Sequence, residues 1–154
     1  MIDVRITGAS FSPEAEINRF NQRRGTTIGA LATFVGYCRA TSDHGDVAQL
    51  ELDHYPGFTE AEVRRLAEQT AQRNGLDDLI VVHRFGPIDA GEPIVLVGAQ
   101  SEHRAAAFAA VAELMDYLKT DAPFWKREIG PNEARWVEPT DNDRARRNAH
   151  GDDR

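Results

Sequence analysis

SEHRAAAFAAVAELMDYLKTDAPFWKRE, residues 101–128, is the stretch that does most to define the fold of this chain. Ser101 is a favourable N-cap for the longest helix of the sequence, expected over about residues 102–119. Pro123 cannot continue a helix and therefore marks its end. The aromatic and charged residues that follow the proline begin a new segment.

The sequence on either side of this helix indicates more strands than helices. Two further helices are expected, one from Ser12-Pro13-Glu14 to about Arg23 and one from a capping box at Thr59-Glu60-Ala61-Glu62 to Asn74-Gly75. Apolar or alternating stretches typical of strands lie at residues 2–7, 27–37 (expected to be buried), 50–55, 79–85 and 94–99.

Some neighbouring strands are joined by connections too short for a parallel crossover, a turn around Gly86-Pro87 and Gly91 among them. We therefore predict an α+β fold with a mostly antiparallel sheet, forming a single domain over residues 1–140. A mobile loop is expected at residues 39–46. The polar residues from 141 to 154 predict a flexible tail.

Composition narrows the possible functions. A net charge of −7 argues against a general nucleic-acid binder, although six Arg or Lys between Lys126 and Arg147 suit a small anionic ligand or an acidic partner. Cys38 is the only cysteine, so an internal disulfide is impossible. No signal peptide is recognisable and no apolar run is long enough to span a bilayer, so we expect a cytoplasmic protein without membrane contact.

Lysine is almost absent from this chain. Lys119 and Lys126 are its two lysines, against sixteen arginines, and they stand seven residues apart. Arginine stays protonated near neutral pH, whereas a lysine amine can act as a nucleophile or a proton acceptor once burial or a neighbouring cation lowers its pKa. The pair therefore indicates a site that needs amines, although two residual lysines on a solvated surface would look the same.

One stripe of the long helix combines apolar and cationic residues. Its members are Arg104, Phe108, Val111, Met115, Leu118 and Lys119, of which Phe108, Val111 and Leu118 are most simply core residues. Fifteen residues of helix separate Arg104 from Lys119 by about 22 Å. The two cations therefore serve different ligands, or a symmetric dimer brings Arg104 of one chain towards Lys119 of the other.

Anion binding is also indicated at the start of this helix and after the strand at residues 27–37. His103 and Arg104 occupy the first helical turn, where free N–H groups attract phosphate or carboxylate. Arg39 follows the strand and could hold a phosphate, whereas neighbouring Cys38 has no activating motif. Phe124 and Trp125 could form a pocket wall, or Trp125 could fill the core.

No metal or cofactor site is expected. His54 and His83 lie in strand patterns and are interpreted as structural, and no histidine has the partner spacing of a zinc helix.

Several blocks of this sequence resemble the large, catalytic subunit family of molybdopterin synthase, the MoaE family. They are Thr33-Phe34-Val35-Gly36 with Arg39, Leu52–Gly57, His83–Gly86, Ser101–Arg104, Met115–Thr120 and Ala122–Glu128. The resemblance implies an α/β-hammerhead fold and a homodimer that binds two small ubiquitin-like sulfur-carrier subunits, giving a heterotetramer. The carrier's C-terminal Gly-Gly thiocarboxylate would donate sulfur to cyclic pyranopterin monophosphate, forming the dithiolene of molybdopterin.

The resemblance also assigns roles to residues. Lys119 and Lys126 match the catalytic lysines, and Arg39, His103 and Arg104 match residues that bind the pterin phosphate. The other expected substrate-binding residues are Phe34, Tyr37, Cys38, Met115, Arg127 and Glu128. The family often has a basic residue shortly after Trp136-Val137-Glu138, where this chain has Pro139-Thr140, so Arg144, Arg146 or Arg147 would have to supply that charge.

Two other functions remain open at this point. The basic residues could hold an acidic peptide or a nucleotide in a non-catalytic binding module. The lysines could instead serve an unrelated enzyme that forms a Schiff base with a carbonyl substrate.

Overall fold

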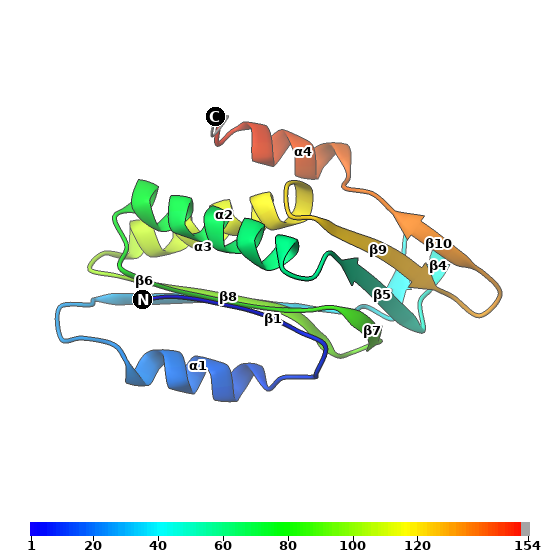
Figure 1. The fold of residues 1–154 in the computed structure, drawn as a ribbon, viewed down its shortest axis with the longest axis horizontal. Helices are drawn as coiled ribbons and strands as arrows, with labels where there is room; N and C mark the ends of the chain where they lie inside the picture. The colour runs from blue at the N-terminus through cyan, green and yellow to red at the C-terminus, as the bar shows by residue number, and fades with distance from the viewer. Residues whose placement is uncertain (152–154) are drawn as a thin grey trace.

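The computed structural model describes residues 1–151, which form two four-stranded sheets, one two-stranded hairpin and four helices. The first sheet has the order β1 (Ile2–Thr7), β6 (Asp78–Arg84), β8 (Pro93–Ser101), β2 (Ala30–Tyr37). β1 and β6 are parallel and the other two pairings are antiparallel. Helix α1 (Pro13–Gln22) covers one face of this sheet, whereas α2 (Phe58–Asn74) and α3 (Arg104–Thr120) cover the other (Figure 1).

The second sheet lies beyond one end of the first and is entirely antiparallel (Figure 1). Its order is β10 (Ala134–Val137), β9 (Phe124–Ile129), β5 (Gln49–His54), β7 (Gly86–Asp89). A short hairpin of β3 (Thr41–Ser42) and β4 (Gly45–Asp46) lies beside it, and α4 (Asp141–Asn148) follows β10. In the part of the chain that the structure describes, no helix is long and apolar enough to cross a membrane.

The largest apolar cluster fills the space between the first sheet and the helix pair α2 and α3. Its fully buried members include Val63, Leu66, Leu79, Val81, Val97, Leu114 and Tyr117. Phe20 of α1 forms a smaller cluster with Ile80, Val82 and Leu96 on the opposite face. The fold therefore has two layers of helix around one sheet, and the second sheet extends from its end.

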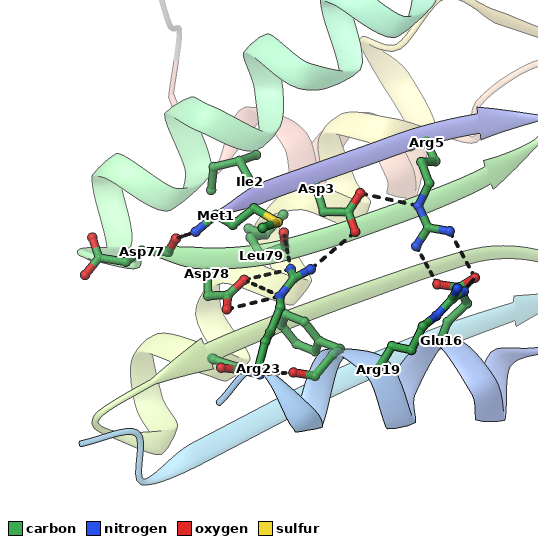
Figure 2. A network of polar contacts seen from close by, with 12 residues as sticks. Met1, Ile2, Asp3, Arg5, Glu16, Arg19, Arg23, Asp77, Asp78 and Leu79 are labelled. Atoms are coloured by element: carbon green, nitrogen blue, oxygen red, sulfur yellow. Dashed lines mark hydrogen bonds and ion pairs between the residues drawn. The ribbon is translucent and has the colours of Figure 1, made fainter. Parts of the chain in front are cut away.

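Ion pairs fasten α1 to the edge of the first sheet (Figure 2). Arg23 Nε lies 3.0 and 3.2 Å from the two carboxylate oxygens of Asp78. Glu16 accepts hydrogen bonds from Arg5 and Arg19, and the bond from Arg5, despite burial, helps to hold the pKa of this carboxyl below its usual range. These contacts lie on the face of the sheet away from α3, so we assign them a structural role.

The α+β class and the mostly antiparallel pairing are confirmed, and so are most element positions. Ser12 caps α1 by accepting a hydrogen bond from the Ala15 N–H at 3.2 Å. Gly75 ends α2 in the left-handed conformation, at φ 66°, which glycine adopts without steric penalty.

The expected capping box at Thr59 does not form. Its hydroxyl accepts a hydrogen bond from the Tyr55 N–H at 2.9 Å and donates one to the Pro123 carbonyl at 3.0 Å. Thr59 therefore joins the start of α2 to the turn between α3 and β9. Ser101 likewise ends β8 instead of capping α3, and His103 occupies the N-cap position.

Two expected loops contain strands. Gly86–Asp89 forms β7 of the second sheet instead of a simple turn, and the loop predicted at residues 39–46 contains the β3–β4 hairpin. β2 is also less buried than predicted, because it lies at the edge of its sheet, and Phe34 is 41% exposed.

Phe108 is not a core residue, since 67% of its surface is exposed. Helix α3 instead turns Ala107, Ala110 and Leu114 inward. Small side chains on that face allow the helix to approach its neighbours closely, which the apolar periodicity did not reveal.

Residues 141–148 form α4, whereas a flexible tail was expected from residue 141. Thr140 and Asp143 make a reciprocal capping box at the start of this helix. Arg147 then forms an ion pair with Asp121, and Nε2 of His150 lies 2.7 Å from Oδ2 of Asp116 in α3. Polar contacts, which an analysis of apolar burial overlooks, thus order this segment. Residues 152–154 of the expected tail lie outside the described residues.

Candidate functional site

The two lysines belong to different elements that meet at one end of the molecule. Lys119 lies in the last turn of α3, and Lys126 lies in β9, after a turn at residues 121–123. Burial lowers the pKa of the Lys126 ammonium, and the charges of Lys119 and Arg39 lower it further. Glu128 and Asp143 act in the opposite direction. The fold thus brings the two lysines and Arg39 close enough for their charges to interact.

An open pocket lies against Lys126. It is lined by Tyr37, Arg39, Thr41, Ser42, Val47, Leu50, Ile94, Lys126 and Glu128. Lys126 and Glu128 are two residues apart in β9 and so face the same side of the sheet. Glu128 is buried and accepts a hydrogen bond from the Ser42 hydroxyl at 2.8 Å, which anchors the β3–β4 hairpin at the pocket.

Lys119 is the more accessible of the two amines, with 54% of its side chain exposed. Its Nζ lies 3.9 Å from Oδ1 of Asp143 in α4. A cation in the last turn of a helix is also favoured by the helix dipole. Lys119 is thus a solvent-accessible amine with the Asp143 carboxylate beside it.

Backbone hydrogen bonds fix the chain where it leaves β2. The Cys38 N–H donates to the Glu92 carbonyl at 2.9 Å, and the Cys38 carbonyl accepts from the Gly91 N–H at 2.7 Å. These bonds present Arg39 at the pocket. The Cys38 side chain is buried in the cluster beneath the second sheet, and burial raises the pKa of its thiol. Cys38 therefore does not line the pocket, and its thiol is held in the unreactive protonated form.

His83 is a neighbour of Lys126 that the sequence indicated only as a structural residue. Its ring stacks on Phe124 with centroids 4.0 Å apart, and its Nδ1 lies 2.8 Å from the Arg84 carbonyl oxygen. Burial lowers the pKa of His83 to about 4, and the charge of Lys126 also contributes. His83 is therefore neutral at physiological pH and forms an uncharged support behind the lysine.

The side chains of Arg127 and Trp125, the neighbours of Lys126 in β9, face away from the pocket. Arg127 lies on the opposite side of β9 from Lys126, pairs with Glu51 and has its guanidinium 5.7 Å from the centre of the Trp136 ring. Trp125 shares that outer face and packs edge-on against Tyr55, with ring centroids 4.6 Å apart. Neither side chain lines the pocket, and Trp125 does not fill the core.

Two of the expected site residues, His103 and Arg104, are not brought to the lysines within one chain. His103 and Arg104 are exposed at the opposite end of α3, about 22 Å from Lys119 along the helix axis. Phe34 is exposed on the edge strand β2 and does not line the pocket. Met115 precedes Lys119 by one turn of α3, on the same side of the helix, and packs partly against the main core.

No arginine of α4 lines the pocket in place of the expected basic residue near position 140. Thr140 itself is the N-cap of α4. Arg144 lies 3.9 Å from Glu138 and 3.8 Å from Asp141, and Arg147 pairs with Asp121. Asp143 of α4 lies beside Lys119 and its charge also acts on Lys126. It was not predicted, although Thr140 and Asp143 have the spacing of a capping box.

Comparison with known proteins identifies the family of this chain. The profile of the family described as MoaE protein matches residues 6–121. The molybdopterin synthase catalytic subunit of Brucella melitensis is 49% identical over 127 residues, which cover 82% of this chain and 76% of the relative. The subunit of the same name from Caulobacter vibrioides is 46% identical over 141 residues, 92% of each chain.

A solved structure shows the same fold. Molybdopterin cofactor biosynthesis protein E from Burkholderia multivorans superimposes with a TM-score of 0.81 at 38% identity, covering 100% of this chain and 99% of that chain. Since the family profile spans most of the sequence and the relatives are similar along nearly its whole length, this chain belongs to the MoaE protein family.

Proposed function

We propose that this protein is the catalytic subunit of a molybdopterin synthase. It would transfer sulfur from the C-terminal thiocarboxylate of a small ubiquitin-like carrier to cyclic pyranopterin monophosphate. The observation that carries the proposal is the half-buried amine of Lys126, set beside the cations Lys119 and Arg39 at an open pocket. Relatives that share over 40% of its residues bear the name of this subunit.

The charges of the pocket suit both reactants. A thiocarboxylate and a cyclic phosphate are anions, and clustered cations attract them and stabilise charge that develops during transfer. Arg39 keeps its charge at any relevant pH and suits the phosphate. Lys126, whose pKa is lowered, can in addition exchange a proton with the substrate.

We assign the two lysines different tasks. Lys119 is exposed and would act at the carrier's C-terminal carbonyl or transfer a proton there. Lys126 is more buried and would orient the pterin and stabilise developing charge. The carrier's extended C-terminus would then approach from the solvent side of Lys119.

A second copy of the chain would complete the site. His103 and Arg104 are too far from Lys119 to touch the same small substrate within one chain, and a symmetric dimer can bring them to the partner's lysines. The exposed aromatic side chains of Phe34 and Phe108 are the kind of apolar surface that such a dimer buries. Mixing a His103/Arg104 double variant with a Lys119 variant should restore activity through hybrid dimers, and hybrids without activity would exclude a composite site.

The catalytic role is tested by Lys119→Arg and Lys126→Arg in an assay with thiocarboxylated carrier and pterin substrate. Each variant keeps the charge but loses the titratable amine, so we expect dithiolene formation to slow by about 10²–10⁴-fold, the usual range for a lost acid–base group. Arg65→Lys is a matched control, since Arg65 contacts Glu62 and Gln69 of its own exposed helix face.

The outcomes separate the candidate functions. Near wild-type rates in both arginine variants would show that charge alone suffices. Binding of carrier and pterin without turnover by the wild type would indicate a binding module. The lowered pKa of Lys126 also suits an enzyme that forms a Schiff base. Trapping of a carbonyl compound on Lys126 by borohydride would favour that function instead.

A further inference from the structure

Helix α4 is docked over the C-terminal end of α3 (Figure 1), the end at which Lys119 lies. Arg147 Nε donates to both carboxylate oxygens of Asp121, at 2.9 and 3.1 Å. His150 Nε2 lies 2.7 Å from Oδ2 of Asp116. The Arg147 guanidinium also lies 5.3 Å from the centre of the Tyr117 ring. These contacts hold the helix in one position relative to the last two turns of α3.

The carboxylate of Asp143 is fixed at the start of this helix. Its Oδ2 accepts a hydrogen bond from the Thr140 N–H at 3.0 Å, and its own N–H donates to the Thr140 hydroxyl at 3.1 Å. Its other oxygen, Oδ1, lies 3.9 Å from Lys119 Nζ, and only 17% of the side chain is exposed. One oxygen thus holds the carboxylate in place while the other lies towards Lys119.

We propose that Asp143 is a positioning residue, which holds the Lys119 ammonium beside Lys126 and offsets the repulsion among the cations of the site. Its assignment to sulfur transfer rests on the proposed function. Lys119, Lys126 and Arg39 carry like charges at a partly desolvated site, where such charges repel one another more strongly than in water. A nearby carboxylate offsets this repulsion. Helix α4 thereby becomes part of the site.

Asp143 has the suitable position among the charged groups near Lys126. Among the described residues, the titratable and charged groups that act on Lys126 or respond to its charge are Lys119 of α3, Arg39 after β2, Glu128 of β9, Asp143 of α4, His83 of β6 and Cys38. Of the two carboxylates, Glu128 already accepts from Ser42 and pairs with Arg135. Asp143 is the one that lies against Lys119.

The test compares Asp143→Asn with Asp141→Asn. Asparagine at 143 keeps an oxygen for the Thr140 N–H but removes the charge. Asp141 lies in the same first turn of α4, so its replacement removes the same helix-end charge, yet its contact is with Arg144. ¹⁵N NMR of lysine Nζ atoms is well suited, because the chain supplies only two such signals.

We expect Asp143→Asn to lower the pKa of Lys126, to shift the Lys119 resonance and to slow single-turnover sulfur transfer about fivefold, or about 1 kcal/mol. Asp141→Asn should change none of these. Thr140→Val removes the cap hydroxyl but keeps the carboxylate, so it should leave the Lys126 titration near that of the wild type.

Equal titrations of Lys126 in Asp143→Asn and Asp141→Asn would overturn the proposal. So would an equal drop in Asp143→Asn and Thr140→Val, since the effect would then belong to the helix cap and not to the charge. If the wild type transfers no sulfur from charged carrier, the proposed function fails, and the NMR comparison still decides the role of Asp143.

Discussion

Replacing Gly98 by alanine tests the packing between α1 and the first sheet. Gly98 lies within β8, paired with Ile80 of β6 and Thr33 of β2. A Cβ there would lie 2.8 Å from Ile80 Cγ2 and 2.9 Å from Phe20 Cε2. Both neighbours are buried, Phe20 completely, so neither can swing into solvent. The strand, the helix or both must shift.

The expected cost of this shift is about 1–3 kcal/mol, the usual range for overpacking a well-filled core. In a chain of this length each kcal/mol lowers the melting temperature by about 2–4 °C, which gives a fall of about 2–12 °C. Urea and thermal unfolding followed by circular dichroism measure both quantities. Gly25→Ala is the matched control, because its Cβ would meet nothing within 4 Å.

The control should be neutral or slightly stabilising, since alanine restricts the unfolded chain. If Gly98→Ala and Gly25→Ala unfold at the same temperature, Phe20 does not pack on β8 as described. The clash lies on the α1 face, away from the lysines, so folded Gly98→Ala protein should retain the activity of the wild type at low temperature.

Three further outcomes are expected. His83 is neutral when folded and its pKa is lowered from 6.5 to about 4, so between these values the unfolded chain binds the proton and the folded chain does not. Stability should therefore fall by about 3 kcal/mol as the pH drops from 6.5 to 4, and urea titrations should show less of this loss in His83→Gln. Arg147→Gln should weaken the docking of α4 on Asp121, seen as faster amide exchange over residues 145–148 with little change in global stability. Cys38 should react with a thiol reagent only on unfolding, because its buried thiol has a raised pKa, and Cys38→Ala should still transfer sulfur; a fast-reacting or essential thiol would contradict its placement.

Local sequence signals predicted the elements that depend on local chemistry. Ser12 before Pro13 marked the start of α1, and Gly75 marked the end of α2, because caps satisfy backbone groups within a few residues. The lysine spacing likewise predicted that Lys119 and Lys126 belong together, since only a short turn separates their elements.

Long-range pairing was beyond local reasoning. The pocket exists because β9 pairs with β5, which sets Lys126 opposite Leu52, and because the β3–β4 hairpin reaches Glu128 through Ser42. Neither contact leaves a periodic trace in the sequence. Helix α4 was not predicted, for a related reason. A capping box and ion pairs order this segment, whereas the prediction of a flexible tail rested on its polar composition.

The scarcity of lysine acquires a physical meaning from these surroundings. Burial and the charges of Lys119 and Arg39 lower the pKa of Lys126 and so favour its neutral form. An arginine at that position would keep its proton in the same surroundings, and so could not exchange one with a substrate. Arg39 can thus provide constant charge while Lys126 provides the titratable group, and we expect the pH dependence of the site to follow the lysine. The same cations would repel one another without a carboxylate nearby, which is the place that Asp143 occupies.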